Sequence, residues 1–541
     1  MRLYSPPWWL LLLVPPASLA LRKAYSIDEF QYAHSAWLMA KGQVPYRDFF
    51  EVHLPLVYQA LSPLFKIFGD APQNVVALRA GMLLFVAVQV WALHWLNRES
   101  GSLASWLAPL FWVSSITALP LATEIRPDSA SFAFYALALA AASSPLRPTR
   151  RGVLIGASVV LAVWGSQKAL FHGAVFGIAL LLDLRRPLPE KRLGSFRAVA
   201  SGAALALLPI ATWLTVERAW LPAWEWCFRW ARDHQRGYPG FSFWRYFGPA
   251  LTAEPLFFSL AVFGALGALV RWRDHGLLVA AWLLSFGSFA LQRAPYPYSL
   301  LPFMGVSAAL AARGAQAIWE TFAPRPSLKR GAALTLALVL GLQHWRLLQL
   351  PGNAEQRKVQ ARIGELTRVT DAAYDNSGGY VTRPHAHFFF YTDAYLRTHW
   401  AQTLEDDVPR ALLESECVLR VQDVRSDTLP PKLVQFLSEN YQPVDGDLSL
   451  WGRRLSVTAD GTFEGQFYAV KSDRYFVQPA EAQGGLRIDG LRVGPVFTLT
   501  RGWHSVRYRG SASELFLLWL PRNQERWMPT YGRAPHYSRL F

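Results

Sequence analysis

The chain has few charged residues and almost no cysteine. Only 17% of its 541 residues are charged, whereas 52% are hydrophobic and 14% are aromatic. This composition is too apolar for an ordinary soluble domain and indicates a membrane protein. The two cysteines, Cys227 and Cys417, have no metal-ligand spacing and lie far apart in the sequence, so they allow at most one disulfide and require none.

Acidic residues are outnumbered by basic ones. The chain has 54 Lys and Arg residues against 38 Asp and Glu, which gives a net charge of +16. Such an excess can indicate nucleic-acid binding, but here the basic residues cluster in short segments between apolar runs, where they set membrane topology. We therefore predict that the chain contacts a lipid bilayer and has no nucleic-acid partner.

Long apolar runs fill the first 350 residues. They lie at 6–21, 75–96, 103–122, 129–144, 152–166, 169–184, 197–216, 252–270, 276–291, 297–313 and 331–349. Several are shorter than the roughly 20 residues that an upright transmembrane helix needs, and 165–168 is a candidate break within one long helix. The pattern predicts a polytopic α-helical membrane protein with about eleven transmembrane helices.

Basic residues alternate from one connection to the next. With a cytoplasmic N-terminus, the cytoplasmic connections carry them, for example at 147–151, 271–273 and 313–330. This positive-inside asymmetry places the first loop and the whole C-terminal region outside the cytoplasm. Arg22 and Lys23 run against the rule. Either they are functional or the first segment is a cleaved signal peptide, and we favour a retained helix that anchors the loop behind it.

Apolar runs of spanning length are missing after residue 350. We expect a transmembrane domain at 1–350, an extracytoplasmic α/β module at 351–455 and an extracytoplasmic β-sandwich-like module at 456–541. A helix is expected at 356–367, and strand-like stretches lie at 379–382, 417–421, 465–470, 485–490, 496–499 and 503–509.

An acidic pair, Asp28 and Glu29, follows the first apolar run at the head of a polar loop. Charge beside a membrane is costly unless it has a function. One interpretation is a catalytic carboxylate. The other is that both residues cap the following helix at its positive end, and the two roles are compatible.

Other charged residues stand at the same predicted side of the membrane. Lys168 and Arg293 end apolar segments, where they either bind a phosphate or extend to the interface without a ligand. Arg126 and Asp128 either form an ion pair at a helix start or extend the acidic cluster toward a metal or an acceptor.

Two histidine motifs could bind a metal or a phosphate. Glu51 and His53 would share one face of a strand, although no third ligand is obvious. His385 and His387 form a similar pair, which we interpret as surface residues. The cofactor is therefore left open, with a divalent cation as the candidate.

Together these residues resemble the GT-C glycosyltransferases, especially bacterial relatives of the dolichyl-phosphate-mannose protein mannosyltransferases and of the lipid A aminoarabinose transferase. The resemblance covers residues 20–315. Its most specific part is the first loop, and the motifs are Asp28-Glu29, Gly42-x-x-Pro45-Tyr46, His53-x-Pro55, Arg126-Pro-Asp128, Gln167-Lys168 and the segment from Arg293 to Pro302. The C-terminal strands resemble sugar-binding-like sandwiches appended to some membrane glycosyltransferases.

The resemblance implies a multi-pass enzyme of the bacterial inner membrane. It would transfer a hexosyl or pentosyl group, with inversion, from a polyprenyl-phosphate-linked sugar to a protein, lipid or cell-envelope glycan. The implied site residues are Asp28 as base, Glu29 as its orienting neighbour, Lys168, Arg293, Arg126 and His53 at the donor phosphate, Asp128 and Glu51 near the acceptor or a metal, and Tyr296 and Tyr298 in the substrate groove.

The competing interpretation is a transporter or flippase of lipid-linked sugars. Such a protein would carry charged residues along a path through the middle of the membrane. Here the charged candidates gather on one predicted side, and no inverted repeat is visible in the sequence. We therefore favour the transferase.

Overall fold

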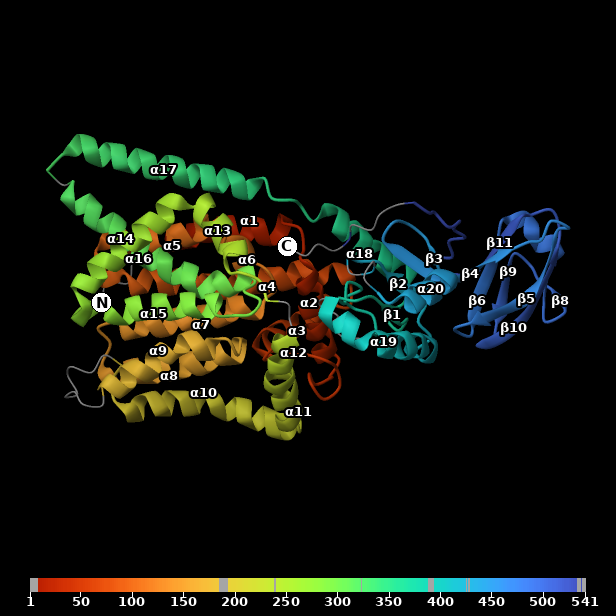
Figure 1. The fold of residues 1–541 in the computed structure, drawn as a ribbon, viewed down its shortest axis with the longest axis horizontal. Coiled ribbons are helices and arrows are strands. Elements are labelled where there is room, and N and C mark those ends of the chain that lie inside the picture. Colours follow the sequence, from red (N-terminus) through yellow and green to blue (C-terminus); the bar gives the residue numbers. More distant parts are fainter. Residues whose placement is uncertain are drawn as a thin grey trace. The chain divides into compact units, whose positions relative to one another are not determined.

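The computed structural model describes residues 8–183, 193–237, 240–322, 324–387, 394–424, 426, 429–532 and 537. The chain divides into two compact units (Figure 1). The helical unit comprises Met1–Lys23, Leu38–Leu64 and Val76–Gly352, and the mixed unit comprises Ala24–Trp37, Phe65–Val75 and Asn353–Phe541. The segment that carries Asp28 is thus grouped with the C-terminal region.

The helical unit is built almost wholly from helices. In chain order they are α1 (Val14–Arg22), α4 (Val75–Leu96), α5 (Ser102–Ser114), α6 (Leu119–Ala122), α7 (Pro127–Ala142), α8 (Pro148–Gly165), α9 (Ala169–Asp183), α10 (Phe196–Val216), α11 (Trp220–Trp224), α12 (Ala231–Gly237), α13 (Trp244–Ala253), α14 (Pro255–Val270), α15 (Trp272–Ala290), α16 (Leu301–Thr321) and α17 (Pro326–Leu348). Short 3₁₀ or π turns lie at Trp8–Leu13, Glu225–Trp230 and Pro297–Leu300 (η6). Helices α2 (Ile27–Ala40) and α3 (Leu56–Phe68) have residues in both units.

Each of the eleven predicted apolar segments contains a helix, but the predicted count of eleven spans is not confirmed. Among the described residues, three helical stretches are long and apolar enough to cross a membrane, at Pro72–Ser100, Phe196–Val216 and Pro326–Leu348. The bent pair α13 and α14, which meet at 97°, adds a fourth if it forms one span. Helices α3, α5 and α9 are apolar but have only 13 to 15 residues. The predicted break at 165–168 is confirmed, because α8 ends at Gly165 and α9 begins at Ala169.

Close helix packing depends on small residues. A Cβ atom added to Gly156 of α8 would lie 2.0 Å from the carbonyl oxygen of Val199, and one added to Gly202 of α10 would lie 2.0 Å from that of Val153. Glycine at both positions therefore lets the backbones of α8 and α10 approach closely, as small residues do between membrane helices. Helices α7, α8, α9 and α10 lie side by side in Figure 1.

The mixed unit contains a seven-stranded sheet, ordered β1-β2-β4-β11-β6-β9 with β3 also paired to β4. Its strands are β1 (Ala373–Tyr374), β2 (Leu419–Val421), β3 (Tyr441–Pro443), β4 (Leu448–Ser456), β6 (Asp473–Gln478), β9 (Val496–Leu499) and β11 (Glu514–Trp519). The first half of β4 pairs with β2 and β3, and its second half pairs with β11. One strand is thus shared by the α/β part and the β-rich part.

Helices accompany the first part of this sheet. They are α18 (Ala354–Leu366), α19 (Ala394–Glu414) and α20 (Pro431–Asn440), and α18 confirms the helix expected at 356–367. The strand expected at 379–382 is wrong. Val381 has a φ of 52°, and its N–H donates to the Gly378 carbonyl, so the segment turns instead of extending.

A second sheet has the order β5-β10-β7-β8, with β5 at Thr462–Ala469, β10 at Gly502–Arg509, β7 at Leu486–Ile488 and β8 at Leu491–Arg492. It packs on the first sheet through one face. The Trp451 indole donates to the Tyr468 carbonyl at 2.9 Å, and Phe467 meets Tyr475 edge to face. The predicted strands between 465 and 509 are therefore confirmed, and alternate residues of β10 face outward.

Candidate functional site

Helix α2 begins with a hydrogen bond to Glu29, the second residue of the acidic pair. The Glu29 carboxylate accepts the Ser26 N–H at 3.0 Å, and its side chain is fully buried. A glutamate at the third position of a helix that bonds back to the residue before the helix is half of a capping box. The capping interpretation is thus confirmed for Glu29. Asp28, in the same turn, is only half-buried.

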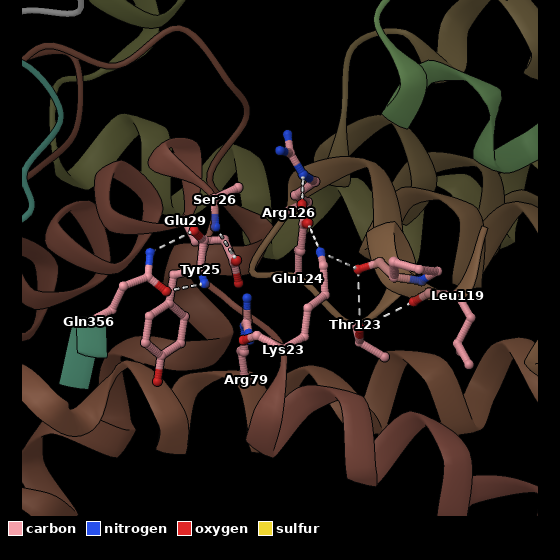
Figure 2. Close-up of polar contacts among 11 residues, drawn as sticks. Lys23, Tyr25, Ser26, Glu29, Arg79, Leu119, Thr123, Glu124, Arg126 and Gln356 are labelled. Atoms are coloured by element: carbon pink, nitrogen blue, oxygen red, sulfur yellow. Dashed lines mark hydrogen bonds and ion pairs between the residues drawn. The ribbon is translucent and has the colours of Figure 1, made fainter. Parts of the chain in front are cut away.

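The residues just before Asp28 are fixed by Gln356 of α18 (Figure 2). Its amide oxygen accepts the Tyr25 N–H at 2.7 Å, and its amide nitrogen donates to the Tyr25 carbonyl at 3.0 Å and to the Tyr537 carbonyl at 2.7 Å. All of these groups are buried. A side chain 331 positions away therefore holds both backbone groups of the residue that leads into α2.

A second contact holds the middle of α2. His34 lies with Nδ1 2.7 Å from the Val381 carbonyl and Nε2 3.2 Å from Nδ1 of His385. Burial and the neighbouring His385 hold the pKa of His34 well below its usual value, so we expect a neutral ring. Burial likewise lowers the pKa of His385 to about 4. His385 is partly exposed and contacts the fully buried His34.

In the helical unit, Lys168 lies among residues from two other segments of the chain. Its Nζ is 3.0 Å from the Asp128 carboxylate at the start of α7 and 3.3 Å from the Ser299 hydroxyl in η6. It also stands 4.3 Å from the centre of the Tyr298 ring, within cation–π distance. The Lys168 side chain is 26% exposed, so it can reach a ligand.

Arg126 contacts the same aromatic ring. Its guanidinium carbon is 4.5 Å from the centre of Tyr298, and Tyr296 stacks on Tyr298 at 5.6 Å. Unlike Lys168, Arg126 is fully buried. Its guanidinium therefore lies beneath the Tyr298 ring and away from solvent. The structure thus brings together Lys168, Asp128, Arg126, Tyr296 and Tyr298, all of which were predicted as site residues.

Glu124 links Arg126 to Lys23 (Figure 2). Burial alone would raise the pKa of Glu124, but the charges of Lys23 and Arg126 outweigh it and lower the pKa to about 2. Lys23 also donates to the Pro120 carbonyl at 3.2 Å. Sequence reasoning missed Lys23 and Glu124 as part of this cluster. The available signal was that Lys23 opposes the positive-inside rule.

Arg22, the other basic residue that opposes that rule, has a different role. Its guanidinium donates to the Leu348 carbonyl at 2.9 Å, at the last residue of α17. A cation at this position satisfies a free carbonyl and stabilises the negative end of the helix. Both exceptions to the charge rule thus have structural partners within the helical unit.

Glu51 and His53 lie in a loop, not in the strand that would have aligned them. The fully buried Glu51 carboxylate accepts the N–H groups of Val52 and His53 at 2.8 and 3.0 Å and lies 2.9 Å from His53 Nδ1. The neighbouring Gln167 donates to the Val52 carbonyl at 2.8 Å. Glu51 and His53 therefore meet because the carboxylate folds back on its own loop. Gln167, the residue before Lys168, holds that loop through its bond to Val52.

Arg293 is exposed on the surface of the helical unit. Its carbonyl accepts the Phe241 N–H at 3.1 Å, and the Phe241 ring meets Tyr296 edge to face at 5.4 Å. Within the described part of the chain, the Arg293 guanidinium has no acidic partner. It is thus connected to the tyrosines through Phe241 but is not part of the ion-pair cluster.

Two groups of ion pairs lie beside Tyr298. Glu124 pairs with Lys23 and Arg126, and Asp128 pairs with Lys168. A phosphate at Lys168 would gain a charge-assisted hydrogen bond there. Over the described residues, no group of three or more His, Cys, Asp or Glu side chains has the geometry to hold a metal ion. Both cysteines are free thiols and are buried.

No family model matches the chain, and no curated protein is similar to it in sequence. Among solved structures, the chain is similar to ArnT of Cupriavidus metallidurans bound to undecaprenyl phosphate, with a TM-score of 0.58 and 13% identity over 83% of this chain and 98% of that one. The apo structure of the same ArnT gives a TM-score of 0.58 and 14% identity over 82% and 97%. The fold of this chain is therefore similar to that of ArnT.

A second GT-C structure is more distant. The Archaeoglobus fulgidus oligosaccharyltransferase tethered to an acceptor peptide matches with a TM-score of 0.47 and 12% identity, over 84% of this chain and 73% of that one. The match to ArnT takes in nearly the whole of ArnT. The resemblance found in the sequence is therefore confirmed at the level of the fold.

Proposed function

We propose that the protein is an inverting glycosyltransferase that takes its sugar from a polyprenyl-phosphate carrier. The observation that carries the proposal is Tyr298, whose ring contacts both Lys168 and Arg126, in a chain with the fold of ArnT. ArnT has been solved with undecaprenyl phosphate, which is a polyprenyl phosphate. A partly exposed lysine beside an aromatic ring suits the phosphate of such a donor.

In this proposal, Lys168 binds the donor phosphate and Arg126 supports it from the buried side of Tyr298. As the anomeric bond breaks, the phosphate leaves with the bonding electrons, and its growing charge is stabilised by Lys168. Asp128 keeps the Lys168 ammonium in place before the donor binds. Arg293 and His53 are secondary phosphate contacts, and Tyr296 extends the aromatic surface along the donor.

Asp28 is the proposed base. An acceptor hydroxyl or amine attacks the anomeric carbon opposite the phosphate, and Asp28 takes the proton that this group loses. One in-line displacement of this kind inverts the anomeric centre. Glu29 contributes by fixing the first turn of α2, which it caps. Phosphate is a good leaving group, so no protein acid is needed to protonate it.

The reaction is proposed to occur at the extracytoplasmic face of the bacterial inner membrane, with the C-terminal region on that side. The acceptor is a protein, a lipid or a cell-envelope glycan, and the transferred group is a hexose or a pentose. Glu51 and Asp128 are the carboxylates proposed to lie toward the acceptor or a divalent cation. Each already has partners in the structure.

The proposal is tested by release of free polyprenyl phosphate from a panel of polyprenyl-phosphate sugars. The purified protein is assayed in lipid nanodiscs with a cell-envelope extract as the acceptor. Asp28→Asn is compared with Asp406→Asn, which changes an exposed aspartate on α19. We expect release by the wild type and by Asp406→Asn, and loss of release in Asp28→Asn. Equal inactivity of all three proteins, together with movement of lipid-linked sugar across the bilayer, would favour a transporter instead.

A further inference from the structure

Three arginines stand side by side on the outer face of the four-stranded sheet. In the strand register, Arg507 of β10 lies opposite Arg487 of β7, and Arg487 lies opposite Arg492 of β8. All three side chains are exposed. Directly opposed residues on neighbouring strands have Cβ atoms about 5 Å apart, so this arrangement places like charges together and destabilises the sheet.

Only one end of this arginine row is neutralised. Glu464 of β5, opposite Arg507, accepts from its guanidinium at 2.7 Å. Arg487 donates to the Gly490 carbonyl at 3.2 Å. In the part of the chain that the structure describes, neither Arg487 nor Arg492 has a carboxylate within ion-pair distance. A row of unneutralised guanidinium groups that costs stability is expected where an anion binds.

An aromatic platform lies on the same face of β10. Trp503 is 62% exposed and meets its cross-strand neighbour Tyr468 edge to face at 5.2 Å. Positions 503, 505 and 507 alternate with buried residues and point the same way. Because a strand rises about 3.3 Å per residue, Trp503 lies roughly 13 Å from Arg507, with Ser505 and its partner Gln466 between them.

We propose that this outer face binds a glycan that carries carboxylate or phosphate groups. The exposed Trp503 ring offers a flat apolar surface to a sugar ring, while Ser505 and Gln466 offer hydrogen-bonding groups next to it. The arginine row then binds the acidic groups, since the planar guanidinium matches carboxylate and phosphate geometry. This binding goes beyond the proposed transfer reaction and needs no donor.

A membrane surface fits these observations less well. Segments that bind anionic lipids are usually clusters of lysine and arginine on an amphipathic helix or beside a transmembrane helix. Here the basic residues are arginines on a flat sheet, and polar side chains separate them from the one large aromatic residue. The inner face of β10 does not contribute, because His504, Val506 and Tyr508 are buried beneath it.

The test measures binding of soluble acidic glycans to the full-length protein in phosphatidylcholine nanodiscs. The probes are polygalacturonate, glycerol-phosphate teichoic acid and, as an uncharged control, dextran. The variants are Arg487→Gln with Arg492→Gln, and Trp503→Ala. The matched control is Arg474→Gln with Arg526→Gln, which removes two exposed arginines outside the row.

We expect one acidic glycan to bind far better than dextran. The Arg487 and Arg492 double variant should weaken its Kd at least tenfold and Trp503→Ala at least fivefold, whereas the matched control stays within twofold. The Tm of the row variant should equal or exceed that of the wild type, because a repulsion is removed. Polygalacturonate and teichoic acid distinguish carboxylate from phosphate recognition.

Three results would overturn the proposal. The first is equal weakening of glycan binding by the row variant and the matched control, and the second is binding of neither acidic glycan. The third is arginine-dependent binding to phosphatidylglycerol vesicles in the absence of glycan binding, which would assign the face to lipid. Because the measurement needs no turnover, it can be repeated in Asp28→Asn, so its outcome is independent of the transferase assay.

Discussion

Buried carboxylates are stabilised differently in the two units. In the helical unit, Glu124 lies between Lys23 and Arg126, and its pKa falls to about 2. In the mixed unit, Asp375 accepts backbone N–H groups from residues 377, 378 and 379. Burial and the nearby Asp423 nevertheless raise the pKa of Asp375 to about 7. One carboxylate is held by opposite charges and the other by its own loop.

The two kinds of contact have different structural consequences. Paired charges in the helical unit compensate the buried guanidinium of Arg126, which would be costly to bury without a counter-ion. Hydrogen bonds to the backbone in the mixed unit fix the shape of loops instead. The loop that Asp375 shapes leads directly to Val381, whose carbonyl contacts His34 of α2. Charge pairing thus neutralises a buried cation, whereas backbone bonding shapes a loop that contacts the helix carrying Asp28.

The largest effect is expected from Glu124→Gln, which tests whether paired charges stabilise the helical unit. It leaves Lys23 and Arg126 without their shared counter-ion in a place where Arg126 is fully buried. Removing one partner from a buried ion pair costs about 3–5 kcal/mol, so we expect a large loss of thermal stability. Thermal unfolding in nanodiscs measures it. Glu481→Gln, which changes an exposed glutamate, is the control, and similar Tm values for the two variants would contradict charge pairing as the stabilising cause.

Replacing Gln356 tests the role of hydrogen bonds to the backbone in the mixed unit. Gln356→Leu leaves the buried Tyr25 N–H and carbonyl without their partner, which costs about 1–3 kcal/mol for each unsatisfied group. If this contact positions Asp28, kcat should fall about tenfold or more while KM for the donor changes little. Gln435→Leu alters an exposed glutamine on α20 and should leave both constants unchanged. A change confined to stability, with kcat intact, would reduce Gln356 to a structural role.

The pH dependence of stability separates the two carboxylates. Because the folded state raises the pKa of Asp375 from 3.8 to about 7, the folded protein holds a proton that the unfolded chain has lost between those values. Stability should therefore fall as the pH rises from about 4 to 7, by at most about 1.4 kcal/mol per pH unit. Glu124 acts in the opposite sense, since its contribution is present above about pH 4.5 and is lost as the pH falls toward 2.

Asp375→Asn measures the first of these effects. The variant cannot ionise at this position, so its Tm should change less between pH 5 and pH 7.5 than that of the wild type. Asp445→Asn, in the turn before β4, provides a comparison in the same unit. Parallel pH profiles for the wild type and Asp375→Asn would show that Asp375 does not carry the titration.

The smallest expected effect concerns Tyr298. Tyr298→Phe keeps the ring that faces Lys168 and Arg126 and should leave the donor KM within about twofold. Tyr298→Leu removes the cation–π contacts, which are worth about 0.5–2 kcal/mol, and should raise the donor KM about threefold to tenfold. An equal effect of both variants would indicate that the hydroxyl, not the ring, is required.

The sequence predicted the local elements well. Apolar runs placed all eleven helical segments, and Gly165 to Lys168 marked a real break. Alternation between 465 and 509 placed the strands of the second sheet. These features depend on neighbours within a few residues, which is the range over which hydrophobic periodicity carries information. The fold was predicted from the resemblance of the first-loop motif to a known family.

Long-range pairing could not be predicted in the same way. Lys23 meets Glu124 across 101 positions, and Gln356 meets Tyr25 across 331, and neither contact leaves a periodic signal. A strand was expected at 379–382, but the loop turns there and Val381 has a positive φ. Tertiary contacts override local propensity at each of these places.

The central claim is that Lys168 binds the phosphate of a polyprenyl carrier, and its most direct test is the affinity for undecaprenyl phosphate. Binding is measured for the wild type, Lys168→Met and Lys432→Met, the last altering an 82% exposed lysine in the mixed unit. A lost charge-assisted hydrogen bond is worth roughly 1.5–3 kcal/mol, so Lys168→Met should weaken the Kd by tenfold or more. Lys432→Met should bind as the wild type does. Equal Kd values for all three proteins would contradict the account.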